Sequence, residues 1–134
     1  MKYRILIVDD QVALADTLRQ ILERHGYECA MAHTGNQALD KLTSFYPDLV
    51  LSDVIMPGMD GIEFARVAQN VLPGCPILLC SGNATTQELI ENAEADGESV
   101  IVLPKPIAPR DLLAQISRSI EASMQSGLKR AAEA

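Results

Sequence analysis

The chain has no apolar run long enough to cross a membrane. A helix that spans a bilayer needs roughly 18 or more consecutive apolar residues, whereas the opening run in MKYRILIVDD is broken by Asp9 and Asp10. The same break argues against an N-terminal export signal, which requires an uninterrupted apolar core. We therefore expect no membrane association and a cytoplasmic location.

Basic residues are scarce. Eleven Lys and Arg stand against 18 Asp and Glu, which gives a formal net charge of -7. This excess of negative charge opposes binding to nucleic acid phosphates or to an anionic membrane surface, and no basic element of the helix-turn-helix type is apparent. The acidity suits cations or basic partners, or it serves solubility alone. We expect no nucleic acid partner.

Only three cysteines occur: Cys29, Cys75 and Cys80. Each lies in or beside an apolar run, where a free thiol packs as a small apolar group. Their spacing matches no common zinc pattern, and His25 and His33 are not placed to complete one. We expect three buried, reduced thiols, which are typical of a reducing compartment.

The 134 residues suffice for one domain with a single core. We expect that domain to occupy residues 1–124. Residues 125–134 are small and polar, and they form a short tail that extends the last helix, frays or begins a linker.

Short apolar runs alternate with segments of helical periodicity, which predicts an α/β fold. The expected strands are 5–8, 29–32, 49–51, 77–80 and 100–103. The expected helices cover about 11–25 and 35–45, begin after Gly61 and at Thr85 or Thr86, and begin again near Pro109. Such alternation favours a doubly wound parallel sheet with helices on both faces.

Polar residues stand at the carboxyl ends of four of these strands. Asp9 and Asp10 follow the first strand, Asp53 the third, Ser81 the fourth and Lys105 the fifth. Because parallel strands end at one edge of the sheet, and because ligand sites lie at that edge, we expect these five side chains to converge.

Three converging carboxylates repel one another unless a cation joins them, and oxygen-only ligands suit Mg²⁺. Each residue also has a simpler explanation. Asp9 and Asp10 suit the capping of the following helix, Ser81 suits a turn with Gly82 and Asn83, and Lys105 suits an exposed loop. These explanations account for the residues singly and not for their convergence. The Lys105–Pro106 peptide bond is a candidate for the cis form, which is essentially confined to X-Pro bonds.

The set Asp9-Asp10, Asp53 followed by MPGMDG, Ser81 and Lys105-Pro106 resembles the receiver domain of two-component response regulators, of the single-domain chemotaxis type. The resemblance covers residues 2 to about 122. It implies a flavodoxin-like, five-stranded parallel sheet of order 2-1-3-4-5 with five helices.

The resemblance also implies the chemistry. Asp53 would be the phosphoacceptor, with Ser81 and Lys105 on the phosphoryl oxygens. Asp9, Asp10, Asp53 and the backbone carbonyl of Ile55 would hold Mg²⁺. The donor would be a phosphohistidine of a sensor histidine kinase or a histidine phosphotransfer protein, and the aspartyl phosphate would switch a surface that contacts an unknown downstream protein or forms a homodimer. The chain would be a signalling switch in a phosphorelay and not an enzyme.

One position departs from the family pattern. Receivers usually carry an aromatic residue three positions before the lysine, where this chain has Val102. The stiff β-branched side chain of valine has no comparable rotation. The aromatic part of the switch is therefore not expected here.

Two other functions fit parts of the pattern. A phosphohydrolase with an aspartyl-phosphate intermediate commonly has a second aspartate two residues after the nucleophile, where this chain has Ile55 after Asp53 and Gln11 after Asp9, so no general acid is apparent. A receiver-like interaction module that is never phosphorylated would not need all five polar residues.

Overall fold

Five parallel strands form one sheet at the centre of the molecule. A computed structural model describes residues 2–81 and 100–133, with the backbone alone described for Val100 and residues 126–133. The strands are β1 Arg4–Val8, β2 Glu28–Ala32, β3 Leu49–Asp53, β4 Ile77–Ser81 and β5 Val100–Pro104. Their order is β2-β1-β3-β4-β5, and every neighbouring pair is parallel. The predicted sheet and strand order are confirmed.

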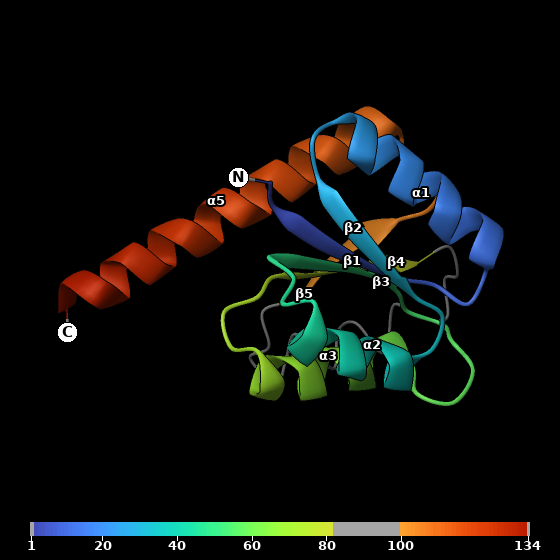
Figure 1. Cartoon of the computed structure of the whole chain (residues 1–134), viewed down its shortest axis with the longest axis horizontal. Helices are drawn as coiled ribbons and strands as arrows, with labels where there is room; N and C mark the ends of the chain where they lie inside the picture. Colours follow the sequence, from blue (N-terminus) through green and yellow to red (C-terminus); the bar gives the residue numbers. More distant parts are fainter. Residues whose placement is uncertain (1, 82–99, 134) are drawn as a thin grey trace.

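Helices cover both faces of the sheet (Figure 1). The described helices are α1 Val12–Arg24, α2 Gly35–Ser44, α3 Gly61–Val71 and α5 Pro109–Glu133. Helices α1 and α5 lie on one face, and α2 and α3 lie on the other. The predicted helix that begins at Thr85 or Thr86 lies outside the described residues, as does Asn83.

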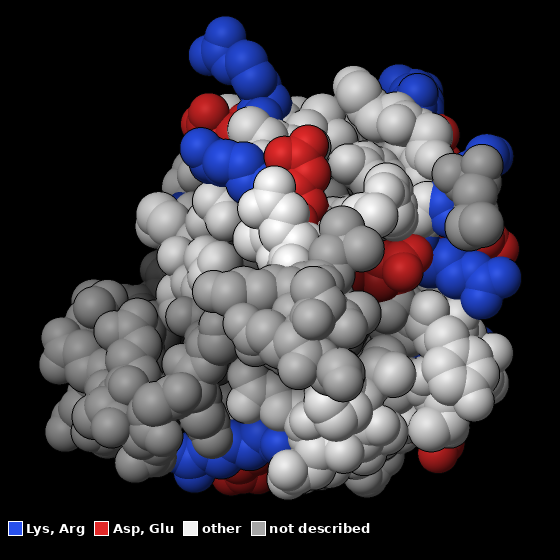
Figure 2. Space-filling model, turned by 90° about the vertical axis from the view of Figure 1, so that its left-hand side faces the viewer, with Lys and Arg blue, Asp and Glu red and all other residues white. Residues whose placement is uncertain are grey.

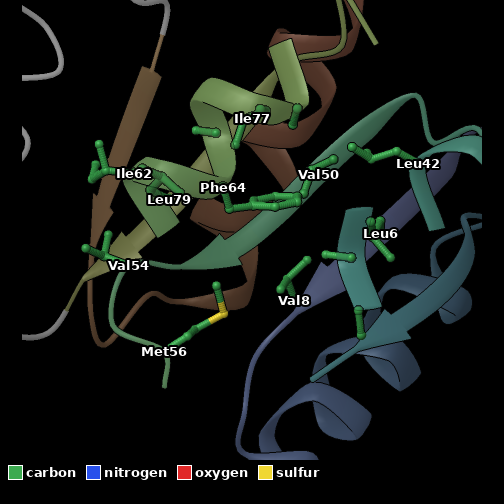
Figure 3. Packing of buried hydrophobic residues seen from close by; sticks show 14 residues of the cluster. Leu6, Val8, Leu42, Val50, Val54, Met56, Ile62, Phe64, Ile77 and Leu79 are labelled. Atoms are coloured by element: carbon green, nitrogen blue, oxygen red, sulfur yellow. The ribbon is translucent and has the colours of Figure 1, made fainter. Parts of the chain in front are cut away.

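The strands bury both of their faces because a doubly wound sheet has a core on each side. In β1, Leu6 packs toward α2 and α3, whereas Ile5 packs toward α1 and α5, and both are fully buried. Phe64 of α3 fills the centre of the first core, beside Val50 (Figure 3). The uninterrupted apolar strands predicted this burial.

Helix α5 continues beyond residue 124, the end of the domain predicted from the sequence. It packs Leu112, Ile116 and Ile120 against the sheet and continues to Glu133, so its end projects beyond the sheet (Figure 1). Of the three alternatives for the tail, the extended helix is the one observed up to Glu133. No helix in the described ranges has the length and apolar character to cross a membrane.

The prediction of three buried thiols is wrong for two of them. All three cysteines are free, but only Cys80 is buried, whereas Cys29 and Cys75 are half-buried. Cys29 lies on β2, which is at the edge of the sheet and pairs with β1 alone. Cys75 lies in the short segment before β4. Burial nevertheless raises the pKa of each thiol to about 12, so all three stay protonated at neutral pH.

Charged side chains on the face shown in Figure 2 lie in small groups in which both signs often adjoin. Among the described residues on that face, basic side chains do not merge into one continuous patch.

Candidate functional site

The ends of β1 and β3 bring three carboxylates together. The two strands are neighbours, with Val8 paired to Ser52, so the residues that follow, Asp9 and Asp53, lie side by side. One carboxylate oxygen each of Asp9, Asp10 and Asp53 lies within 4.8 Å of the others. The predicted convergence of these aspartates is therefore observed.

Lys105 faces this group from the end of β5. Its Nζ lies 3.4 Å from Asp53 Oδ2 and 3.8 Å from Asp9 Oδ2. Its backbone N–H donates to the carbonyl of Ser81 at 2.9 Å, which joins the ends of β5 and β4. The Lys105–Pro106 bond is cis, as predicted. Lys105 is thus a half-buried cation at the acidic group and not a fully solvated loop residue.

Ser81 is the last residue of β4 and is half-buried. Its strand neighbours place it at the same edge, because Cys80 pairs with Asp53 and Ser81 pairs with Pro104. The structure thus places all five predicted polar residues at one edge of the sheet.

Ile55 and Val102 are the two other positions that the sequence singled out. Ile55, two residues beyond Asp53, has 51% of its surface exposed, and Val102 packs into the core under α2 and α3. Val102 therefore serves as an apolar core contact at the position where receivers usually carry an aromatic residue.

Gly61, the first residue of α3, packs against the backbone at the end of β3. The N–H of Gly61 donates to Val54 O at 2.7 Å, and the N–H of Val54 donates to Cys80 O at 3.1 Å. Asp60 then caps α3, because its Oδ1 accepts from the N–H of Glu63 at 2.8 Å. This packing fixes the backbone that carries Asp53.

Asp9 is the most buried of the three aspartates, with 3% of its surface exposed. Burial raises its pKa, and this effect outweighs the hydrogen bond from Gln11 N–H and the charge of Lys105, which both lower it. A buried carboxylate of this kind gains stability when a cation replaces the lost water.

Neither Asp9 nor Asp10 is the N-cap of α1. The N-cap of α1 is Gln11, whose side chain makes no capping bond, and the first turn contains no acidic residue. Asp9 Oδ1 instead accepts from the backbone N–H of Gln11 at 2.9 Å. One carboxylate oxygen of Asp9 thus binds the backbone at the start of α1, and the other faces Lys105 at the strand edge.

The donor set fits a small, hard cation. Three carboxylates supply only oxygen, and their separation allows a single ion to contact all of them. Mg²⁺ prefers oxygen ligands and is commonly held by few carboxylates together with water and phosphate oxygens. The ammonium of Lys105 neutralises part of the negative charge of Asp9 and Asp53. Together with a bound cation it would allow an anionic group to approach the carboxylates.

We expect Asp9→Asn to stabilise the metal-free protein by about 1 kcal/mol, because the neutral amide is easier to bury than the carboxylate and still accepts from Gln11. The raised pKa means that the folded state binds this proton more tightly than the unfolded state. Stability contributed by Asp9 thus falls as pH rises above 3.8, the ordinary pKa of the group.

Urea denaturation with a chelator present measures this gain, and the difference between variant and wild type should shrink as pH falls toward 3.8. In Mg²⁺ the wild type should become more stable than Asp9→Asn, since the ion stabilises only the protein that binds it. Equal responses of the two proteins to Mg²⁺ would exclude Asp9 from the metal site.

Comparisons with known proteins agree with this geometry. A family model, the response regulator receiver domain, matches residues 5–117. The response regulator MprA of Mycobacterium bovis (strain BCG / Pasteur 1173P2) is 37% identical over 116 residues, which cover 87% of this chain and 50% of that protein. The chain thus spans about half the length of the curated relatives it matches.

Solved structures show the same likeness. A CheY-like response regulator receiver domain protein from Methanospirillum hungatei JF-1 has a TM-score of 0.83 and 34% identity, covering 94% of this chain and 99% of that chain. The signal receiver domain of an HD domain-containing protein from Pseudomonas fluorescens Pf-5 has a TM-score of 0.86 and 30% identity, covering 93% and 99%.

Proposed function

The chain belongs to the response regulator receiver domain family, and on that premise we propose that Asp53 accepts a phosphoryl group from a phosphohistidine donor. The observation that carries the proposal is the meeting of Asp53 with two further carboxylates and with the ammonium of Lys105 at one strand edge. A carboxylate so placed is a nucleophile that faces a cationic binding site for phosphoryl oxygens.

In the proposed reaction, an oxygen of Asp53 forms a bond to phosphorus while the bond from phosphorus to the donor nitrogen breaks, and the electron pair of that bond leaves with the donor. Lys105 is 3.4 Å from Asp53 Oδ2, so its charge holds the incoming phosphoryl oxygens. We assign Ser81, at the end of the neighbouring strand β4, to a second phosphoryl oxygen. Transfer of this type depends mainly on positioning and charge.

Asp9, Asp10, Asp53 and the carbonyl of Ile55 are the residues that would hold Mg²⁺. When bound, the ion supplies positive charge for the equatorial phosphoryl oxygens. Asp9 accepts from Gln11 through Oδ1, which leaves Oδ2 on the side of Lys105.

The product is a signal and not a released metabolite. Position 55, where a phosphohydrolase of this chemistry would carry an acidic residue, holds an exposed isoleucine. We therefore propose a cytoplasmic switch in a two-component phosphorelay, with a sensor histidine kinase or a histidine phosphotransfer protein as donor. Its output would be contact with a downstream protein.

Wild-type protein incubated with Mg²⁺ and acetyl phosphate should gain the mass of one phosphoryl group, measured by intact mass spectrometry. The same incubation with excess chelator should show almost no gain, because the carboxylates then repel the incoming phosphoryl oxygens. A protein that stays unmodified in Mg²⁺, or that is modified equally with the chelator, would contradict the proposal.

A further inference from the structure

A histidine contacts the backbone of the acidic site. His33 directly follows β2, and its Nδ1 lies 3.0 Å from the carbonyl oxygen of Asp9. A carbonyl oxygen can only accept a hydrogen bond, so Nδ1 carries the proton in this contact. His33 is half-buried, which limits the competition of water for the same carbonyl.

This contact completes the fixation of Asp9. The N–H of Asp9 donates to Ala32 O at 3.0 Å, its carbonyl accepts from His33, and its Oδ1 accepts from Gln11 N–H. Two of the three bonds come from the end of β2 and hold the peptide groups on both sides of the Asp9 Cα. The remaining carboxylate oxygen, Oδ2, faces Lys105.

His33 is itself held by the start of α2. Its backbone N–H donates to Gln37 Oε1 at 2.9 Å, and the N–H of Gln37 donates to the hydroxyl of Thr34, the N-cap of α2, at 3.1 Å. The backbone that carries the imidazole is therefore fixed to the capped N-terminus of α2.

We propose that His33 is a positioning residue for the metal site, which orients Asp9 and Asp10 so that their carboxylates meet Asp53 before an ion arrives. The inference rests on the proposed function, because it assigns His33 to the same Mg²⁺ site. Without the imidazole donor, the peptide between Asp9 and Asp10 is free to rotate toward water. Part of the binding free energy then goes into ordering that peptide, and affinity falls.

The test is Mg²⁺ binding to unphosphorylated protein by isothermal titration calorimetry, with Mg²⁺ alone as ligand. His33→Leu keeps the bulk and removes the donor, and we expect it to bind about tenfold more weakly than wild type. His33→Asn places an amide nitrogen on the same Cγ as Nδ1, so it should restore most of the affinity. A purely steric role would make the two variants alike.

The protein supplies a matched control in His25, its other histidine. His25 Nδ1 also contacts a backbone carbonyl, that of Ile21 at 2.9 Å, but at the far end of α1. His25→Leu should leave Mg²⁺ affinity unchanged.

Gln37→Ala provides an independent variant if His33→Leu fails to fold. It removes the acceptor of the His33 N–H and leaves the imidazole in place, so the affinity should fall by a smaller factor, about threefold. Wild-type affinity in both His33→Leu and Gln37→Ala would overturn the inference alone, as would equal weakening in His33→Asn and His33→Leu. No binding of Mg²⁺ by wild type would overturn the proposed function as well.

Discussion

Asp53→Asn should abolish phosphorylation by acetyl phosphate. The amide has nearly the shape of the carboxylate, but it lacks the negative charge that makes a carboxylate oxygen nucleophilic toward phosphorus. The turn after β3 should keep its place, because the backbone bonds of Val54 to Cys80 and Gly61 do not involve the Asp53 side chain. Intact mass spectrometry in Mg²⁺ should therefore show one added phosphoryl group on wild type and none on the variant.

Asp60→Asn is the matched control for this experiment. It makes the same chemical change seven residues later, at the N-cap of α3, where asparagine caps as well as aspartate. We expect it to be phosphorylated like wild type. The group on wild type should also be released by hydroxylamine, which cleaves acyl phosphates and leaves phosphate esters of serine intact. Phosphorylation of Asp53→Asn at the wild-type rate would assign the acceptor to another residue.

Gly61→Ala should destabilise the fold by about 3 kcal/mol or more, a large part of the stability of a domain of this size. A Cβ at this position would lie 2.9 Å from Val54 Cα and closer still to the carbonyl oxygen of Asp53. Both are backbone atoms of the strand end that carries the acceptor, so neither can move cheaply. A lower urea midpoint, measured by circular dichroism, checks this loss.

Gly35→Ala is the comparison, since Gly35 and Gly61 are each the first residue of a helix. A Cβ on Gly35 would meet the side chain of Met59, at 2.9 Å from its Cβ and 3.0 Å from its Sδ. A loop side chain yields more readily than strand backbone, so we expect a loss of about 1 kcal/mol. Helix propensity favours alanine over glycine at both positions, so equal losses in the two variants would show that the contact with the Asp53 backbone does not decide the result.

The strand ends were predictable because each carries a polar residue directly after an apolar run. Asp9, Asp53 and Ser81 could be placed at one edge from the rule that parallel strands end together, and the structure agrees. The five-stranded order followed from the family resemblance and is confirmed. The identity of the metal ligands and the roles of Ser81 and Lys105 are proposals, and Asp9→Asn tests one of the ligands.

Features that depend on contacts between distant segments were not predictable. The exposure of Cys29 follows from the place of β2 at the edge of the sheet, which the local sequence does not encode. The length of α5 was obscured by Ser126 and Gly127, which resemble a helix stop, although the helix continues through both. His33 had been considered only as a zinc ligand, because its bond to Asp9 joins residues 24 positions apart.

The reach of α5 gives it the mechanics of a lever. Its 25 residues make a rod about 36 Å long, and its first turn follows soon after Lys105. A tilt of about 5° at that end shifts Leu112 by less than about half an ångström, yet carries Glu133 through about 3 Å. Small movements near the acceptor are thus magnified at the C-terminal end of α5. The Ser123 hydroxyl donates to Gly74 O at 2.8 Å, and this hydrogen bond must break before the helix can tilt.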